Sequence, residues 1–512
     1  MSDPREIELK LECEPSDLAS LQDHPLLREA ATQEETDLVS VYFDTPDRQL
    51  RKAKLGLRVR SHGGRFVQTL KAEGDGLFDR PEWEQPLDGP EPDRAALADT
   101  PFARLIDADA PLAPLFTTHV HRRTYLVEQG TSRIEVALDT GRIEAPEAGD
   151  RVLTICEVEL ELKEGTASDL FALAHAIASL APVRLGVRSK AERGYALAAG
   201  EIDRVRKAEP VPLREDMSAA EAFRAVAHAC LRQMRLNEDI LLRERNVDAL
   251  HQMRVGLRRL RSAFSLFGDL VDDTLGARIR TELKEVTEPL GRARNLDVFL
   301  ATILPAERER HPDEVGLLGL ERQLEEERAK AYQDIAALLG SDAWRMLLLD
   351  LIAWINAGPW LREEGRGRAA LRDEPARSFA ARELDRRRRQ VRKRGRHLDA
   401  LDPEERHRVR IAAKKLRYGA EFFAALFPGK RAGKRHDAFG KALSDLQDQL
   451  GALNDIATGH DIVRDLADAP AGASTLFAAG MTAADIEART RTLLEAAAEA
   501  HEDLVDTKPF WR

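Results

Sequence analysis

Over the first 200 residues, apolar and charged side chains alternate at every second position in short runs. Residues 6–12 read Glu-Ile-Glu-Leu-Lys-Leu-Glu, and the same alternation returns at 57–60, 133–139 and 157–163. Successive side chains of a strand point to opposite faces, so this period of two predicts strands with one apolar and one charged face. Gly-rich turn signals separate the runs, and one short helix is predicted over 167–180. This part of the chain therefore predicts an antiparallel, β-rich domain.

From Ser218 onward the apolar residues recur at three- and four-residue spacing, as in 317–339, which is typical of helices. The segment between the strand-like and the helix-like parts, Arg204–Asp216, carries two prolines among charged residues and is predicted to be a linker. The pattern therefore predicts an α+β chain. Its parts are an antiparallel β domain over residues 1–203, a linker over 204–216 and an all-α domain of two repeated helical bundles over 217–508.

The composition limits the class of protein. At roughly 100–200 residues per domain, 512 residues suggest about three domains or two larger ones. Cys13, Cys156 and Cys230 are too few and too scattered for a disulfide framework or a cysteine metal cluster, and they suit a reducing compartment. The N-terminal segment lacks the features of a secretion signal, and the most apolar stretch, 346–361, is interrupted by polar residues and a proline. We therefore expect a soluble, cytoplasmic protein without a membrane partner.

Charge is unevenly distributed along the chain. Residues 1–210 carry 27 Lys and Arg against 39 Asp and Glu, whereas residues 382–417 carry 15 basic against 6 acidic residues. A concentrated basic zone suggests an anionic partner, but a run of charges is also typical of a solvated helix face. Composition alone leaves both interpretations open.

Charged rows of both signs occur in the predicted strands. On a single strand, such a row is the ordinary solvent-facing side of a sheet. If the sheet closes on itself, the rows line a lumen, where this density of charge needs ions or ligands to neutralise it. Clustered carboxylates suit Mg²⁺ or Mn²⁺, and Arg and Lys suit phosphate oxygens, so the rows together indicate a metal–polyphosphate site. The acidic rows are Glu6 with Glu8 and Glu157 with Glu159 and Glu161; the basic positions are Lys10, Arg58, Arg60 and Lys71.

The order of short motifs over residues 3–200 resembles that of the CYTH domain, a member of the triphosphate tunnel metalloenzymes. The resemblance implies an eight-stranded antiparallel tunnel that hydrolyses or otherwise processes triphosphates with a divalent metal. The motifs are ExExK at Glu6–Lys10, YFDT at Tyr42–Thr45, LRVR at Leu57–Arg60, QTLK at Gln68–Lys71, RxExE at Arg80–Glu84, RIEVALDTG at Arg133–Gly141, CEVELEL at Cys156–Leu162 and SKAERGY at Ser189–Tyr195.

The same resemblance implies roles for individual residues. A slip of one residue in its strand would put Arg123 in place of Arg122. Glu135 and Asp139 are expected to support the phosphate clamp and the attacking water. Metal ligands are expected at Glu6, Glu8, Glu157, Glu159 and Glu161, substrate-binding residues at Lys10, Arg58, Arg60, Lys71, Arg122, Arg133 and Lys190, and catalytic residues at Lys10, Arg58, Arg60, Lys71, Glu135 and Asp139.

The helical half contains one basic motif twice. HQMRVGLRRLR from His251 and HRVRIAAKKLR from His407 both place a histidine and three cations at i, i+3, i+7 and i+10, along one helix face. A solvated face is the ordinary interpretation of either copy, but the identical spacing favours a shared polyanion site. Aliphatic residues separate the cations, so platforms for stacking bases are missing and nucleic acid is disfavoured. The candidate polyphosphate-binding residues are His251, Arg254, Arg258, Arg259, Arg261, His407, Arg410, Lys414, Lys415 and Arg417.

Residues 218–505 resemble the CHAD domain, a helical module associated with inorganic polyphosphate. A CYTH-like part followed by a CHAD-like part is similar to bacterial inorganic triphosphatases. The resemblance implies an enzyme that uses Mg²⁺, with Mn²⁺ as the alternative, to hydrolyse tripolyphosphate to pyrophosphate and phosphate, with long-chain polyphosphate as a second partner. The alternatives are a thiamine triphosphatase, a class IV adenylyl cyclase and a non-catalytic polyphosphate-binding protein of polyphosphate granules.

Overall fold

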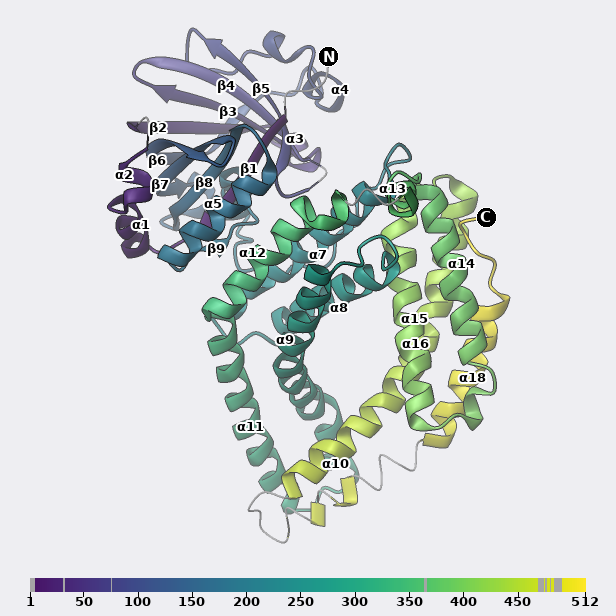
Figure 1. The fold of residues 1–512 in the computed structure, drawn as a ribbon. Coiled ribbons are helices and arrows are strands. Elements are labelled where there is room, and N and C mark those ends of the chain that lie inside the picture. Colours follow the sequence, from purple (N-terminus) through teal and green to yellow (C-terminus); the bar gives the residue numbers. More distant parts are fainter. Residues whose placement is uncertain are drawn as a thin grey trace. The chain divides into compact units, whose positions relative to one another are not determined.

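The computed structural model describes residues 5–30, 33–74, 76–362, 366–467 and 490–512, with single positions between 474 and 482. The chain divides into two compact units. The first comprises Met1–Val205 together with Gly340–Gly358, and the second comprises Arg206–Leu339 together with Pro359–Arg512. The predicted order, a strand-rich part followed by a helical part, is confirmed (Figure 1).

The first unit is built on one antiparallel sheet that closes on itself. Its order is β5-β4-β3-β2-β6-β7-β8-β1-β9, and β1 also pairs with β5 through Arg5 and Pro81. The strands are β1 Arg5–Glu12, β2 Gln33–Asp44, β3 Leu55–His62, β4 Arg65–Ala72, β5 Asp79–Leu87, β6 Ala113–Gln129, β7 Ser132–Glu144, β8 Val152–Glu164 and β9 Arg184–Leu185.

The sheet of the described residues has nine strands, so the expected count of eight is corrected. Strands β1 to β8 form the closed tunnel, and β9 is a two-residue strand that pairs with β1 through Leu185 and Leu11. A segment this short cannot show an alternating pattern, and only its pairing with β1 makes it a strand.

Register places the charged rows side by side on one face. Lys10 of β1 lies opposite Glu159 of β8, and Asp139 of β7 lies opposite Glu157. Leu9, Leu11, Val158 and Leu160 alternate with these residues and are buried in the core. A slip of one residue would move every charge to the apolar face, so burial of the leucines and valines fixes the register of the charges.

Helices cover the outer face and one end of the tunnel. One of them, α12, comes from far along the chain: the segment Gly340–Gly358 leaves the helical unit and packs against α5 and β9 of the first unit. In this packing His175 Nε2 of α5 lies 3.3 Å from Asp350 Oδ1 of α12. The helices of the first unit are α1 Pro15–Gln22, α2 Pro25–Arg28, α3 Gln49–Lys52, α4 Phe102–Leu105, α5 Ala167–Leu180, α6 Lys190–Ala198 and α12 Asp342–Ala357.

The second unit is all helical in the part that the structure describes. An aromatic cluster lies at its centre, where the ring centroids of Phe267 and Phe379 are 4.7 Å apart and those of Phe223 and Phe267 are 5.4 Å apart. Among the described helices, none is long and apolar enough to cross a membrane. The helices are α7 Ala219–Leu241, α8 Val247–Leu266, α9 Thr274–Val298, α10 Leu304–Arg310, α11 Gly316–Leu339, α13 Arg366–Arg372, α14 Ala376–Arg394, α15 Pro403–Phe423, α16 Lys430–Ala467 and α18 Thr490–Asp506.

The membership of α12 in the first unit predicts where a cavity in this helix is felt. Ile352 of α12 and Ile335 of α11 are both buried, and replacing either by Ala should cost about 2–5 kcal/mol of stability. Hydrogen exchange followed by mass spectrometry should show faster exchange in α5 and β9 for Ile352→Ala. The matched change Ile335→Ala should leave α5 and β9 protected and loosen α11 and α9. Faster exchange of Ile352→Ala in α11 and α9 alone would contradict the assignment.

Candidate functional site

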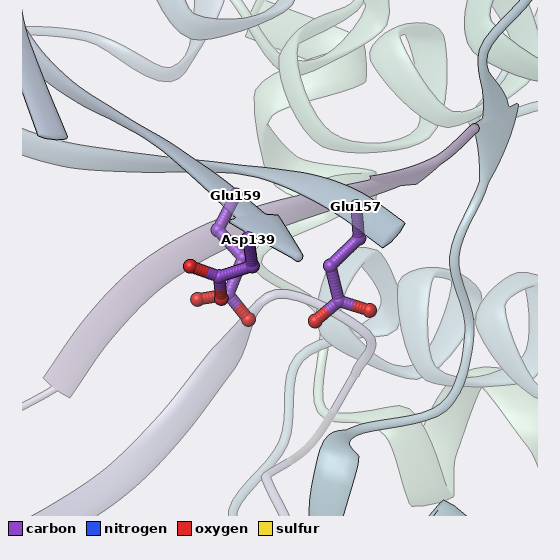
Figure 2. A group of neighbouring side chains, drawn as sticks. All are labelled: Asp139, Glu157 and Glu159. Carbon is purple, nitrogen blue, oxygen red and sulfur yellow. The ribbon is translucent and has the colours of Figure 1, made fainter. Parts of the chain in front are cut away.

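Three buried carboxylates meet inside the tunnel. Asp139 comes from β7, and Glu157 and Glu159 come from β8; one oxygen of each lies within 4.8 Å of the others. Figure 2 shows the three side chains turned toward one another from neighbouring strands. Three negative charges this close repel each other strongly in a buried site, so the cluster persists only with positive partners.

Lysines from two elements supply part of this positive charge. Lys190, the first residue of α6, lies 2.6 Å from Asp139 Oδ2 and 2.9 Å from Glu159 Oε1, and it also bonds Glu157. Lys10 of β1 lies 2.5 Å from Glu159 Oε1 and bonds Glu8 as well. The ammonium groups therefore sit where a bound cation would otherwise neutralise the carboxylates.

Arginines complete the neutralisation. Arg122 Nε donates to Asp139 Oδ1 at 2.7 Å and Arg122 Nη2 donates to Oδ2 at 2.6 Å, and Arg122 also bonds Glu159. Arg193 bonds Glu157. Arg123 instead lies against Glu35, with a distance of 3.5 Å between Nε and Oε2. Of the two neighbouring arginines, the structure thus places Arg122 at the carboxylates.

The neighbouring charges of opposite sign shift the pKa values of Glu159, Asp139 and Lys190. Burial alone would raise the pKa of Glu159, but Lys10, Lys190 and Arg122 hold it well below its ordinary value. Asp139 behaves in the same way: burial opposes ionisation, yet Lys190 and Arg122 keep its pKa below the usual range. Burial would also lower the pKa of Lys190, but the facing carboxylates raise it. Glu159, Asp139 and Lys190 are therefore ionised near neutral pH.

A second wall of the tunnel presents three further cations. Arg58 lies 3.7 Å from Glu82, and Lys71 lies 2.9 Å from the same glutamate. Arg60 Nε donates to Ser40 Oγ at 3.3 Å. Burial, together with repulsion from Arg58 and Arg122, lowers the pKa of Arg60 to about 10.

One donor of this wall is not used by the protein itself. Among the described residues, the buried Nε of Arg58 has no hydrogen-bond partner. The repulsion among Arg58, Arg60 and Arg122 also shows that the three guanidinium groups approach one another. An anion in the lumen would satisfy the orphaned donor and relieve this repulsion.

A further row of acidic residues lies around Glu161, two residues after Glu159 in β8. Register puts Glu8 of β1 opposite Glu161 of β8, and Glu135 of β7 opposite the same Glu161. Lys163 lies 2.7 Å from Glu161 and 3.6 Å from Glu135. The backbone of Glu6 lies in β1 opposite Arg80, but its side chain lies outside the described residues.

Arg133 is the one expected substrate-binding residue of the tunnel that the structure places elsewhere. Its Nη1 lies 3.2 Å from Glu164 Oε1, and about half of its side chain is exposed. A register shift between Arg133 and Ile134 in the pairing of β7 with β8 accounts for this position, because it takes Arg133 out of the row that contains Glu135 and Asp139.

The SKAERGY segment positions α6 through two local devices. The Ser189 side chain accepts from the Glu192 backbone, and the Glu192 carboxylate accepts from Ser189 N at 2.8 Å, so a capping box fixes the start of the helix. Gly194 lies so close to Phe116 that a Cβ atom would come within 2.1 Å of the ring. The cap and the glycine together seat Lys190 at the carboxylates.

Arg193 was missed as a site residue. It bonds Glu157 from the same helix as Lys190. The available signal was helical spacing, since Arg193 lies three residues after Lys190 and therefore on the same face of the helix.

Glu157, Glu159 and Asp139 fit a divalent cation by their chemistry. Carboxylate oxygens are the donors that Mg²⁺ and Mn²⁺ prefer. Asp139, expected at the clamp, stands in the same cluster as the two expected metal ligands Glu157 and Glu159. Each of the three is also bonded by Lys or Arg, so a cation must compete with these side chains for the oxygens.

A separate basic site lies in the helical unit, where the two copies of the repeated motif converge. Arg254 and Arg258 come from α8, and Arg410 and Lys414 come from α15, which packs against α8. Burial, followed by repulsion from Arg410, Arg258 and Arg254, lowers the pKa of Lys414 to about 6. Such repulsion requires the four cations to lie close together, so the copies form one site.

His251 of α8 and Arg294 of α9 also belong to this site. Burial and repulsion from Arg294, Arg258 and Arg254 lower the pKa of His251 to about 4. Gly291 of α9 leaves room for Arg254, because a Cβ there would lie 3.0 Å from Arg254 Nη1. That nitrogen is buried and, among the described residues, lacks a hydrogen-bond partner.

The second copy is held by α16. Asn454 Oδ1 accepts from Arg410 Nη1 at 2.9 Å and lies 3.3 Å from His407 Nδ1. Asn454 therefore orients the basic face of α15.

The remaining four candidates lie elsewhere in the same unit. Arg259 is buried, donates to Gln233 Oε1 at 2.8 Å and stacks over Phe422, which is a structural role. Arg417 Nε donates to Glu421 at 2.9 Å. Lys415 lies near Arg387, Arg394 and Arg261 rather than in the central cluster.

Comparisons with known proteins were made for both halves. The CYTH domain family matches residues 4–195 and the CHAD domain family matches residues 225–464. The inorganic triphosphatase of Haemophilus influenzae is 37% identical over 198 residues, which are 38% of this chain and 55% of that protein. An uncharacterized protein of Mycobacterium tuberculosis is 28% identical over 289 residues, covering 51% of this chain and 52% of that one.

Among solved structures, the CHAD domain of the plant Ricinus communis matches with a TM-score of 0.51 and 30% identity, covering 58% of this chain and 96% of that structure. The chain spans about half the length of the curated relatives that it matches. The two family matches occupy separate segments in the order in which the strand unit and the helical unit follow one another. The chain therefore belongs to the proteins that carry a CYTH domain followed by a CHAD domain.

Proposed function

We propose that the CYTH domain is a metal-dependent triphosphatase that hydrolyses tripolyphosphate to pyrophosphate and phosphate, and that the CHAD domain binds long-chain inorganic polyphosphate. One observation carries the first part: the closed sheet holds a cluster of buried carboxylates together with Arg58, whose buried Nε lacks a hydrogen-bond partner among the described residues. The likeness to an inorganic triphosphatase over the same segment supports it.

The cations of the tunnel bind and orient the phosphate chain. Arg58, Arg60 and Lys71 offer donors on one wall, and Lys10, Lys190 and Arg122 offer donors on the other. Phosphate oxygens can take over bonds that the carboxylates now hold, which releases carboxylate oxygens as ligands. A divalent cation bound there by Glu159 and its neighbours would neutralise charge on the phosphate oxygens.

Positioning of water is the role that we assign to Asp139. Because Lys190 and Arg122 hold the pKa of Asp139 low, its carboxylate accepts a hydrogen bond well but takes up a proton poorly. Asp139 therefore orients the attacking water in line with the leaving oxygen, Glu135 supports the phosphate clamp farther along β7, and the surrounding cations stabilise the charge that develops.

Three aromatic rings of this unit, those of Tyr42, Phe116 and Tyr195, pack on one another and so offer no stacking face for a base. The ring centroids of Tyr42 and Phe116 are 4.5 Å apart, and those of Phe116 and Tyr195 are 5.3 Å apart. All three side chains are buried against one another. A plain phosphate chain therefore suits the site better than a nucleotide or thiamine triphosphate.

The polyphosphate proposal rests on the convergence of α8 and α15. Two helices bring Arg254, Arg258, Arg410 and Lys414 together, and among the described residues the buried Nη1 of Arg254 and the buried Nε of Arg258 and of Arg410 lack hydrogen-bond partners. Asp455 offsets part of this positive charge, and the closely spaced cations that remain stabilise an anion with closely spaced charges.

Phosphate release tests the triphosphatase proposal. With Mg²⁺ or Mn²⁺, the full chain should give a higher kcat/KM for tripolyphosphate than for ATP or thiamine triphosphate, and EDTA should abolish turnover. Glu159→Gln keeps the shape of the side chain but removes its charge, and it should lower kcat/KM by about 100-fold or more. Glu164→Gln on the same strand changes an exposed ion pair with Arg133 and should retain the parent rate.

Full turnover in EDTA or in folded Glu159→Gln would exclude metal-dependent chemistry at this cluster. A higher kcat/KM for thiamine triphosphate, or conversion of ATP to cyclic AMP, would replace the substrate assignment. Binding of tripolyphosphate without any release of phosphate would favour a non-catalytic protein. Thermal unfolding of each variant confirms that it is folded.

The pH dependence of polyphosphate binding tests the second site. Lys414, with its pKa lowered to about 6, is largely neutral at pH 8, and a bound polyanion raises its pKa. Binding therefore takes up a proton, and affinity should fall as pH rises from about 6 to 8 at fixed ionic strength. Lys414→Arg keeps a charge at all these pH values, so it should bind at pH 8 and show a flatter profile.

Substitutions on one helix provide the matched control. Arg410→Ala should weaken long-chain polyphosphate binding by about tenfold and reduce the salt slope by about one. Arg408→Ala removes an exposed arginine that pairs with Glu404 and should bind as the parent does. Equal affinity of both variants, or a parent profile that does not change with pH, would move the polyphosphate site away from α15. The full chain is used because α12 belongs to the first unit.

A further inference from the structure

Two cysteines that are 143 positions apart in the sequence meet on the outer face of the tunnel. Cys13 Sγ lies 3.8 Å from Cys156 Sγ, and Cys13 N donates to Cys156 O at 3.2 Å. Cys13 follows directly after β1, and Cys156 lies in β8, the strand to which β1 is paired. The cysteines are too few and too scattered in the sequence for a disulfide framework, but the pairing of β1 with β8 brings these two together.

The pair lies where a disulfide is geometrically accessible. Glu12 is opposite Glu157, so the next position along each strand brings Cys13 opposite Cys156. Residues directly opposite each other in an antiparallel pair have Cα atoms about 4.5–5.5 Å apart, which is within the range that a disulfide spans. Both thiols are partly exposed, whereas the third cysteine, Cys230 of α7, is buried.

The two thiols do not contact the substrate site. Side chains alternate along a strand, so Cys156 points away from the face that carries Glu157 and Glu159. Nearby charges are negative: Asp17 and Glu14 belong to the segment of α1, and Glu157 follows Cys156. Burial is the largest cause that raises the pKa of both thiols, and Asp17 and Glu157 raise it further. The surroundings therefore keep both sulfurs as thiols, which slows their attack on a peroxide, and they favour the uncharged disulfide once it has formed.

We infer that Cys13 and Cys156 form a reversible disulfide that locks β1 onto β8 when the protein meets a small, neutral two-electron oxidant such as a peroxide. In the reaction, one sulfur attacks a peroxide oxygen, the O–O bond breaks and a sulfenic acid forms. The second sulfur then displaces water from it. Two S–H bonds are lost, one S–S bond forms, and hydrogen peroxide is reduced to two molecules of water.

The lock joins the strands that carry much of the lumen charge. β1 contributes Glu8 and Lys10, and β8 contributes Glu157 and Glu159, all within a few residues of the cross-link. Closing a long loop of chain restricts the unfolded state, so the oxidised protein should resist unfolding of the tunnel. Because the sulfurs lie on the outer face, triphosphate turnover should be retained.

Peroxide treatment of the full chain tests this inference. The intact mass should fall by about 2 Da, non-reducing peptide mapping should link the Cys13 and Cys156 peptides, and dithiothreitol should reverse both changes. The midpoint of thermal unfolding should rise by about 5 °C or more in the oxidised protein. Phosphate release from tripolyphosphate should stay within about twofold of the reduced form, since no sulfur touches the lumen.

Cysteine variants separate this lock from other oxidation. Cys230→Ser should still lose about 2 Da and gain the same thermal shift, whereas Cys13→Ser and Cys156→Ser should do neither. A disulfide between two chains, a link to Cys230 or only sulfenic and sulfinic products would overturn the inference. So would an intramolecular Cys13–Cys156 disulfide that leaves the unfolding midpoint unchanged. None of these outcomes affects the triphosphatase proposal, which the reduced protein tests separately.

Discussion

Mutual neutralisation of buried charges is the constraint on which the tunnel depends. Asp139, Glu157 and Glu159 can be buried together only because Lys190, Lys10 and Arg122 bond them directly. Removing charges from water is costly, and the cost is recovered only with good geometry on both sides. The closed sheet provides this geometry, since the register of β1 with β8 and of β8 with β7 sets each charge opposite its partner. The same arrangement makes the lumen responsive to anions and metal ions, which can exchange with the internal pairs.

The strands and their charged faces could be predicted from the sequence because alternation is a local signal. It placed Glu8, Lys10 and Glu159 on strand faces, and the ordered motifs indicated a closed tunnel. Local patterns could not decide between Arg122 and Arg123, because that choice depends on the pairing of Arg122 with Asp139 across two strands. The position of Arg133 depends on an irregularity of register that leaves no mark in the composition of the strand.

The sequence also could not predict which helices and strands that are far apart along the chain pack against each other. The apolar segment that forms α12 indicates a buried helix, yet nothing in it tells that the helix belongs with α5 and β9. In the helical unit, the repeat suggested one basic face on each copy, and packing of α8 on α15 brings the two faces together. That packing also takes Arg259 into the core beside Phe422, so equal spacing in sequence does not give equal roles.

Exchange of internal ion pairs for substrate and metal is the central claim, and calorimetric titration of metal tests it most directly. Mg²⁺ is titrated into the full chain alone and into the chain saturated with imidotriphosphate, a triphosphate analogue with hydrolysis-resistant P–N–P bridges. Solution binding of Mg²⁺ to the analogue is subtracted. The account predicts at least about tenfold tighter metal binding with the analogue, since the analogue draws Lys10, Lys190 and Arg122 away from the carboxylates. Equal Mg²⁺ affinity with and without the analogue would contradict it.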